Sequence, residues 1–169
     1  GALVQMVAGL TAGRPKYAAV DAEVREIARQ ATELTGIMSA LVEKDAAAYG
    51  AVSAAYKIPK TEPTRQDAIT DALLGAARVP LDTARVAARV AALAARVAEI
   101  GNTNAVSDAG VAALLAEAAC RGAAYNVRIN VAALPERSAG VALVLEADEA
   151  VTAAAGAVVL ATAAVEKHL

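Results

Sequence analysis

The stretch from residue 81 to residue 100, LDTARVAARVAALAARVAEI, decides the fold class. Apolar side chains recur in it at steps of four and three residues, at Val86, Val90, Leu93, Val97 and Ile100. This spacing places them on one face of an α-helix. Alanine, which has the best intrinsic helix propensity, fills most of the other positions. The stretch therefore predicts an amphipathic helix whose small side chains allow neighbouring helices to approach closely.

The composition of the whole chain extends this prediction to an all-α fold. The 169 residues are 57% hydrophobic, yet they include no Phe, no Trp and only four Tyr, so the aromatic and β-branched runs typical of strands are missing. The length fits one domain over residues 1–169. We expect a single-domain, up-and-down bundle of about five to six long, kinked helices. Residues 1–7 already have the character of a helix interior, so we expect an N-terminal segment to be missing from the sequence.

Helical spacing and turn residues together predict where the helices lie. We expect them at about residues 1–10, 20–56, 64–79, 81–100, 105–130 and 138–167. Pro80 is expected to kink or break the chain between the third and the fourth, because proline lacks an N–H and clashes with the preceding turn. Ala118 and Gly122 offer a face for close helix approach.

Several classes of function are disfavoured. The net charge of −2 and the scarcity of aromatic residues argue against nucleic-acid binding. The longest uncharged run, residues 150–165, is shorter than the ~20 residues that span a bilayer, so we expect no membrane partner. One cysteine, Cys120, and one histidine, His168, exclude an ordinary zinc site. We interpret Cys120 as a small buried side chain, and a lone cysteine fits a reducing, cytoplasmic location.

Two charge patterns remain. Arg78, Arg85, Arg89 and Arg96 form a stripe that we interpret as a solvated face. Asp45 interrupts the apolar stripe of the second helix, between Leu41 and Ala48. A buried carboxylate is costly unless it is paired or hydrogen-bonded. Asp45 therefore either has a partner or a chemical task, or the helix curves so that Asp45 reaches water or pairs with Lys44.

The segment from 101 to 110, GNTNAVSDAG, gathers five polar side chains in an otherwise alanine-rich chain. We expect Gly101 to end one helix in the left-handed conformation and Asn104 or Ser107 to cap the next. Asp108 then lies in the first helical turn, where the helix dipole favours a carboxylate. A simple helix junction needs one or two such polar groups, and this junction has more.

Asn126 lies eighteen residues, or five helical turns, after Asp108, and therefore shares its azimuth. The two residues are about 27 Å apart along one helix axis, too far for one small site. Asn126 and Asn130 are thus either ligand contacts or donors of hydrogen bonds between helices.

Residues 13–17, 56–60, 101–110 and 126–130 together resemble the cyclodeaminase/cyclohydrolase family. This family includes the cyclodeaminase half of formiminotransferase-cyclodeaminase and stand-alone methenyltetrahydrofolate cyclohydrolases. The pattern Gly-Asn-x-Asn-Ala-Val-Ser-Asp-Ala-Gly is the most specific part of the match. The chain departs from the family at its start, where a glycine-rich, serine-containing segment is usual. The resemblance implies an all-α homodimer that binds folate near helix ends.

The resemblance also implies the chemistry. Either N10 attacks a formimino carbon on N5 and ammonia leaves, or water adds to a methenyl carbon and opens the ring. A positioned carboxylate can move the protons that both reactions require, with no metal or other cofactor. Asp108 is the first candidate for this role and Asp45 the second.

The expected substrate contacts lie in the same four stretches. We expect the glutamate or polyglutamate tail of the folate to be bound by four cations, Arg14, Lys16, Lys57 and Lys60. The alternative is that these cations are ordinary solvent-exposed loop residues. The other candidate contacts are Tyr17, Asn102, Asn104, Ser107, Asn126 and Asn130. The alternative is a non-catalytic helical scaffold, dimeric or binding a small molecule, which explains the alanine-rich faces but explains the polar junction less well.

Overall fold

A computed structural model describes residues 1–168 of the chain. These residues form five α-helices and no strand, which confirms the all-α bundle. The helices are α1 (Ala2–Thr11), α2 (Asp21–Lys57), α3 (Arg65–Ile100), α4 (Val106–Ala132) and α5 (Val141–Glu166). Three short 3₁₀ helices precede α2, α4 and α5, namely η1 (Pro15–Val20), η2 (Thr103–Ala105) and η3 (Arg137–Gly140).

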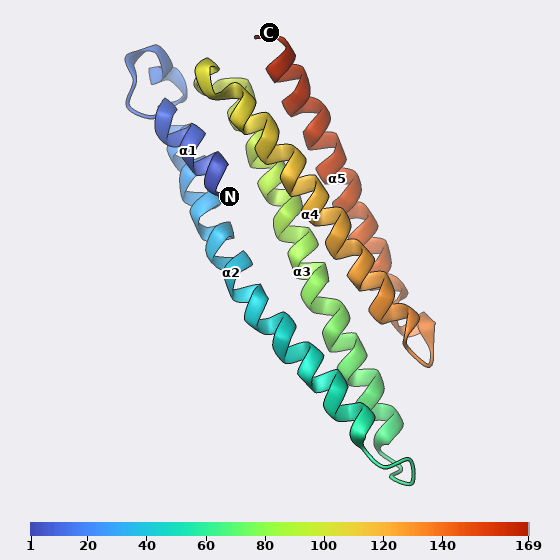
Figure 1. The fold of residues 1–169 in the computed structure, drawn as a ribbon. Coiled ribbons are helices and arrows are strands. Elements are labelled where there is room, and N and C mark those ends of the chain that lie inside the picture. Colours follow the sequence, from blue (N-terminus) through green and yellow to red (C-terminus); the bar gives the residue numbers. More distant parts are fainter. Residues whose placement is uncertain (169) are drawn as a thin grey trace.

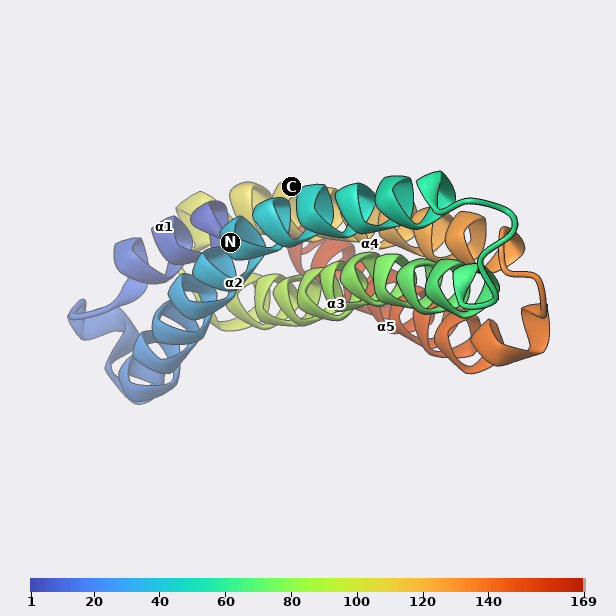
Figure 2. The same cartoon turned by 90° about the horizontal axis from the view of Figure 1, so that it is seen from below.

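The long helices lie side by side along one axis (Figure 1). The central helix is α3, which packs against α2, α4 and α5, and α4 and α5 also pack against each other. The short α1 lies against α2 and the first part of α4. In Figure 2, α4 and the later part of α2 lie above α3 and α5, and the 3₁₀ segment after α1 lies at one end of the bundle. The end of α1 and the start of α4 are therefore neighbours, although about a hundred residues separate them in sequence.

Alanine dominates the core where α3 meets α4. Ala84, Ala91 and Ala94 of α3 and Ala109 and Ala113 of α4 are fully buried. Small side chains leave little to separate the helix axes, so the contact is close and relies on many backbone and methyl contacts. Cys120 is also fully buried, with its Sγ 3.4 Å from the Ala84 carbonyl oxygen, and burial raises the pKa of its thiol. Its interpretation as a small buried side chain is confirmed.

We expected Pro80 to kink or break the chain between two helices, but it does not divide them. Residues 65–100 form the single helix α3, with Pro80 buried inside it. Because proline has no N–H, the carbonyl of Ala76, four residues earlier, lacks its helical donor. The side-chain amide of Asn130, on α4, donates a 3.0 Å hydrogen bond to that carbonyl. Asn130 thus compensates for Pro80 and links α3 to α4, one of the two roles that its sequence position allowed.

Gly101 is required for a different reason than the one predicted. Its φ is −85°, not left-handed, and Gly13 is the only described residue with a positive φ. A Cβ on Gly101 would lie 2.4 Å from the carbonyl oxygen of Val97 and 3.2 Å from the hydroxyl of Thr11. Close packing therefore excludes a side chain there. The cap prediction was also wrong, because Asn102 caps η2 and no side chain caps α4, which begins after Ala105.

The apolar stripe of α2 is buried only along part of its length. Val24, Ile27, Ala31, Leu34 and Leu41 are buried, whereas beyond Leu41 only Ala55 is. Asp45 lies in this second part and is exposed. The alternative in which Asp45 reaches water is therefore correct, although the structure shows no ion pair between Asp45 and Lys44 among residues 1–168.

The arginine stripe of α3 is exposed, as interpreted from the sequence. Two of its members also connect helices. Arg85 pairs with Glu146 of α5 at 2.6 Å, and Arg96 pairs with Glu23 of α2 at 2.6 Å. Exposed pairs of this kind contribute little stability individually.

Candidate functional site

A hydrogen-bonded junction joins the end of α1 to the segment between α3 and α4. The hydroxyl of Thr11, which is fully buried, donates to the Val7 carbonyl at 2.7 Å and accepts from the Asn102 backbone N–H at 2.8 Å. The Asn102 side chain donates from Nδ2 to the Leu10 carbonyl at 3.1 Å and accepts from the Asn104 N–H. Buried polar groups keep their partners here, so the junction has one defined geometry.

Tyr17 extends the junction to η1. Its hydroxyl accepts a 3.2 Å hydrogen bond from the Thr103 backbone N–H, and this bond lowers the pKa of Tyr17. The ammonium of Lys16 lies 5.3 Å from the centre of the Tyr17 ring. Arg14 and Lys16 are exposed beside it. The first turn and the polar junction, both singled out in the sequence, therefore meet at one end of the bundle.

Asp108 lies in the first turn of α4, as predicted, and is half-buried. No other side chain within residues 1–168 forms an ion pair or hydrogen bond with its carboxylate. Asn104 and Ser107, which precede it, are exposed. The carboxylate is thus held at the start of a helix, beside a rigid junction, and available to a ligand.

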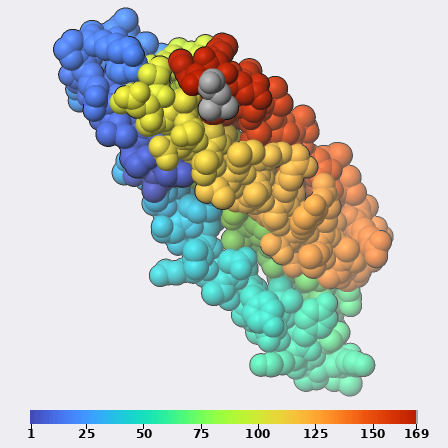
Figure 3. Space-filling view, turned by 45° about the horizontal axis from the view of Figure 1, so that its top comes forward, coloured from blue at the N-terminus to red at the C-terminus, as the bar shows by residue number. Residues whose placement is uncertain are grey.

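An apolar cavity of about 480 Å³ lies between α2, α3 and α4. Its walls come from the first residues of α1 and from α2, α3 and α4, and include Leu3, Met38, Val42, Val90, Ala112 and Leu115. Figure 3 shows the hollow between α2 and α4, with α3 at its floor. Asp108 does not line this cavity, because it lies one helical turn before Ala112.

Asp45 lies beyond the other end of the cavity, about one turn after Val42 on α2. Because α2 and α4 run in the same direction (Figure 1), the two candidate carboxylates flank the cavity instead of meeting in it. No sequence pattern indicated this cavity, because its walls come from four helices.

The remaining candidates are dispersed. Lys57 and Lys60 lie at the α2–α3 connection, a full length of α2, or about 54 Å, from Arg14 and Lys16. The four cations therefore do not surround one ligand tail within one chain. Asn126 is exposed on α4, where its amide contacts only the Gly122 carbonyl of the same helix, at 3.4 Å.

Sequence reasoning missed Thr11, the residue that fixes the junction. A threonine in the last turn of an alanine-rich helix has many ordinary roles, and the partner N–H is 91 residues away. Within residues 1–168, no helix is long and apolar enough to cross a bilayer, and no three His, Cys, Asp or Glu side chains gather as metal ligands.

Comparison with known proteins agrees with the resemblance of the motifs. A sequence model of the family described as formiminotransferase-cyclodeaminase matches residues 1–149. A methenyltetrahydrofolate cyclohydrolase of Methylorubrum extorquens is 39% identical over 141 residues, which are 81% of this chain and 68% of that protein. Formimidoyltransferase-cyclodeaminase of Rattus norvegicus is 32% identical over 133 residues, 76% of this chain but only 25% of the rat protein.

The fold is also that of a solved relative. The crystal structure of formiminotetrahydrofolate cyclodeaminase from Thermotoga maritima superposes with a TM-score of 0.90 at 29% sequence identity. The match covers 98% of this chain and 81% of the Thermotoga chain. Similarity of fold therefore extends over nearly the whole bundle.

Proposed function

Because the chain belongs to the formiminotransferase-cyclodeaminase family, we propose that it is an enzyme acting on the one-carbon unit at N5 and N10 of tetrahydrofolate. The substrate is either 5,10-methenyltetrahydrofolate, which is hydrolysed, or 5-formiminotetrahydrofolate, which is cyclised with release of ammonia. The named relatives include proteins of both activities.

The observation that carries this proposal is the position of Asp108. Its carboxylate is half-buried and unpaired within residues 1–168, at the start of α4, one turn from an apolar cavity. A volume of about 480 Å³ falls in the range of small-molecule sites, and apolar walls suit a flat heteroaromatic ring. The fixed junction of Thr11 and Asn102 keeps the first turn of α4 in place beside it.

In the hydrolysis, Asp108 takes a proton from water as the water oxygen bonds to the methenyl carbon. The tetrahedral carbon then releases N5, which takes the proton from Asp108, while the hydroxyl on that carbon loses its proton to solvent and becomes the carbonyl of the formyl group on N10. In the cyclisation, Asp108 takes the proton of N10 as N10 bonds to the formimino carbon, and the departing nitrogen leaves as ammonia after protonation. One carboxylate that first accepts and then donates a proton serves both reactions.

The other candidates take supporting roles in this proposal. Asn104 and Ser107 contact the pterin or orient Asp108, and Tyr17 and Asn102 hold the junction. Arg14 and Lys16, exposed at the same end, bind the glutamate tail, which includes polyglutamate. Asp45 is the second candidate carboxylate. Lys57 and Lys60 are too distant to reach the same tail in one chain. We also propose that the protein is a homodimer and that it is located in the cytoplasm.

The test is a spectrophotometric assay of both substrates with three variants. We expect Asp108→Asn to fold like the parent, judged by its thermal transition, and to lose turnover at least about 100-fold, the usual range for a general acid or base. Asp71→Asn, which changes an exposed carboxylate on α3, is the matched control and should retain full turnover. Asp45→Asn measures the second candidate separately.

The assay also separates the alternatives. Turnover of only one substrate by the parent identifies the reaction. No turnover of either substrate by the parent would support the non-catalytic scaffold. Parent activity that persists unchanged in Asp108→Asn would disprove the acid/base role of this carboxylate.

A further inference from the structure

The connection between α1 and α2, residues 13–20, passes over the end of the bundle without burying a side chain. Its residues are exposed or half-buried, and none of η1 is buried. Figure 1 shows this α1–α2 segment at the same end of the bundle as the connection between α3 and α4. Because it has no buried side chain, the segment depends on its hydrogen bonds for its position.

Two of these hydrogen bonds involve side chains. At the start of the segment, the Gly13 N–H donates to the Asp21 carboxylate at 2.6 Å, and Arg25 pairs with that carboxylate at 2.7 Å. This bond reaches only the start of α2, which is the neighbour of the segment in sequence. In the middle of the segment, the Tyr17 hydroxyl accepts from the Thr103 N–H at 3.2 Å. Within residues 1–168, it is the only hydrogen bond that joins the α1–α2 segment to the α3–α4 connection.

The Thr103 bond is one of three that complete the turn between α3 and α4. The N–H of Asn102 donates to the fully buried Thr11 hydroxyl at 2.8 Å, and the N–H of Asn104 donates to the Asn102 side chain at 3.1 Å. Both of these acceptors belong to buried residues. The third acceptor, Tyr17, belongs to a segment without buried side chains. The Thr103 bond is therefore the one that can break while the core stays intact.

Two cations lie on one side of this bond and Asp108 lies on the other. Arg14 and Lys16 are exposed and form no ion pair within residues 1–168. The Arg14 carbonyl accepts from the Tyr17 N–H at 2.9 Å, and the Lys16 ammonium lies 5.3 Å from the centre of the Tyr17 ring. Thr103 begins η2, which runs directly into α4, and Asp108 follows five residues later. A carboxylate bound by the two cations would thus act on the same short segment that supports the turn before Asp108.

We propose that Tyr17 is a positioning residue that couples binding of the substrate's anionic tail to turnover; this inference rests on the proposed function. Tail carboxylates bound by Arg14 and Lys16 hold the α1–α2 segment against the bundle. Tyr17 then keeps its bond to Thr103, and the turn that leads to Asp108 stays in one conformation. Binding energy from a part of the substrate far from the reacting carbon is thereby used to raise kcat.

A purely structural role for the Tyr17 hydroxyl has a different consequence. If the hydroxyl only stabilised the turn, its removal would slow every substrate by the same factor. If it couples the tail to Asp108, its removal slows only substrates that have a charged tail. A cycle that combines a change in the protein with a change in the substrate separates these two cases.

The first experiment measures kcat and KM for the substrate that the parent turns over and for an analogue that ends in a neutral benzamide, without the glutamate. In the parent, the analogue should have a kcat roughly 3- to 10-fold lower, the range expected for one hydrogen bond. Tyr17→Phe keeps the ring beside Lys16 but removes the acceptor. It should lower kcat for the full substrate by the same factor, without raising its KM, and should leave kcat for the analogue unchanged.

Tyr49→Phe is the matched control, because it removes the hydroxyl of a tyrosine that is exposed on α2 and belongs to neither the junction nor the α1–α2 segment. Both substrates should be turned over by this variant as they are by the parent.

The second experiment follows hydrogen exchange of the Thr103 amide by NMR and requires no turnover. The probe is p-aminobenzoylglutamate, which has the charged tail but no reacting carbon. It should slow exchange of this amide several-fold in the parent, but not in Tyr17→Phe. Lys16→Gln, which changes an exposed side chain, should also abolish the slowing and keeps the test valid if Tyr17→Phe does not fold.

The outcomes are distinguishable. An equal loss of kcat for both substrates in Tyr17→Phe, or no loss for either, would overturn the coupling and leave the role of Asp108 intact. A probe that does not change exchange of the Thr103 amide would also overturn it. A parent that turns over neither folate would refute the proposed function, and the exchange measurement alone would then decide whether an anionic tail tightens the Tyr17 bond.

Discussion

Asn130 of α4 donates its side-chain amide hydrogen to the carbonyl of Ala76 on α3, the carbonyl that Pro80 leaves without a helical donor. A proline within a helix ordinarily costs a backbone hydrogen bond and exposes a polar atom. Here a side chain from the neighbouring helix supplies the missing donor at 3.0 Å. The same bond fixes α4 against α3, so the compensation is also a tertiary contact.

Asn130→Ala should destabilise the fold by about 1–3 kcal/mol, because it leaves a buried carbonyl without a donor. In a Pro80→Ala background, the backbone N–H of residue 80 can donate to the Ala76 carbonyl. Asn130→Ala should therefore lower the free energy of unfolding clearly less in that background. Urea unfolding of the four proteins in this double-mutant cycle measures the difference. Equal costs in the two backgrounds would show that Asn130 does not compensate for Pro80.

Thr11→Val should destabilise the fold by about 1–3 kcal/mol, because valine has the shape of threonine but leaves the buried N–H of Asn102 without an acceptor. Thr32→Val is the matched control. Thr32 is exposed and donates only to the Ala28 carbonyl of its own helix. Its substitution should therefore change the free energy of unfolding by no more than about 0.5 kcal/mol. Thermal unfolding compares the two, and similar costs would argue against a structural role for the junction.

Gly101→Ala should destabilise the fold by about 1–3 kcal/mol, since its Cβ would lie 2.4 Å from the Val97 carbonyl oxygen and the backbone would have to move. Gly50→Ala, inside α2 with open space around it, should instead stabilise by roughly 0.5–1 kcal/mol. Chemical denaturation measures both. A neutral Gly101→Ala would mean that the α3 end relaxes without cost.

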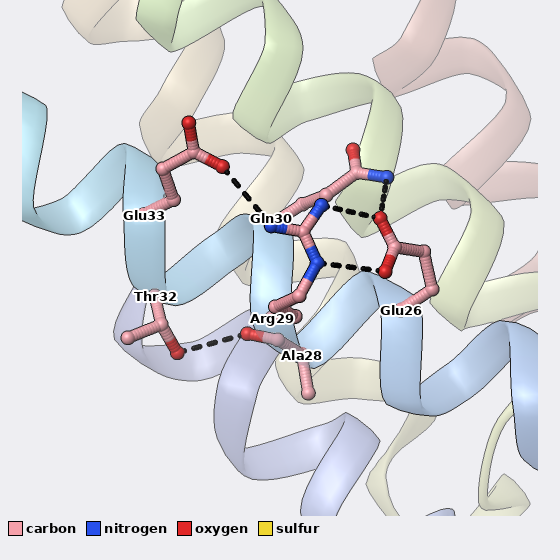
Figure 4. Close-up of polar contacts among 6 residues, drawn as sticks. All are labelled: Glu26, Ala28, Arg29, Gln30, Thr32 and Glu33. Atoms are coloured by element: carbon pink, nitrogen blue, oxygen red, sulfur yellow. Dashed lines mark hydrogen bonds and ion pairs between the residues drawn. The ribbon is translucent and has the colours of Figure 1, made fainter.

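The decrease in the free energy of unfolding at acid pH should depend in part on Glu26. Figure 4 shows the Arg29 guanidinium donating to both oxygens of Glu26, with Gln30 as a further donor. These hydrogen bonds lower the pKa of Glu26 from 4.5 to about 2, and the bond from Arg29 has the largest effect. Because the folded-state pKa is the lower one, the stabilisation is complete above about pH 4.5 and is lost as the pH falls toward 2.

Carboxyl-carbon NMR titration measures this pKa directly, and Arg29→Gln should raise it toward 4.5. Glu26→Gln should reduce the change in unfolding midpoint between pH 5 and about pH 2.5, by a small amount because the pair is exposed and screened by salt. A Glu26 pKa that is unaffected by Arg29→Gln would contradict this account.

The fold class and most helix positions could be predicted from the sequence, because apolar spacing and alanine content act over one helix length. The predicted helix of residues 20–56 agrees with α2, and Asp108 lies in the first turn of α4. The predictions that failed depend on distant residues. Pro80 was expected to interrupt a helix because its compensating donor, Asn130, is far along the chain. The conformation of Gly101 could not be read locally, because its environment includes Thr11 of α1.

The sequence by itself determined that this chain is a bundle of alanine-rich helices with a polar junction of a recognisable family pattern, because helix periodicity and short motifs are local properties. Only the tertiary structure decided that Asp45 faces water, that Lys57 and Lys60 lie far from Arg14 and Lys16, and that an apolar cavity lies between α2, α3 and α4. The physical reason is that burial, cavities and distances between helices are set by which surfaces pack together, and no single helix contains that information.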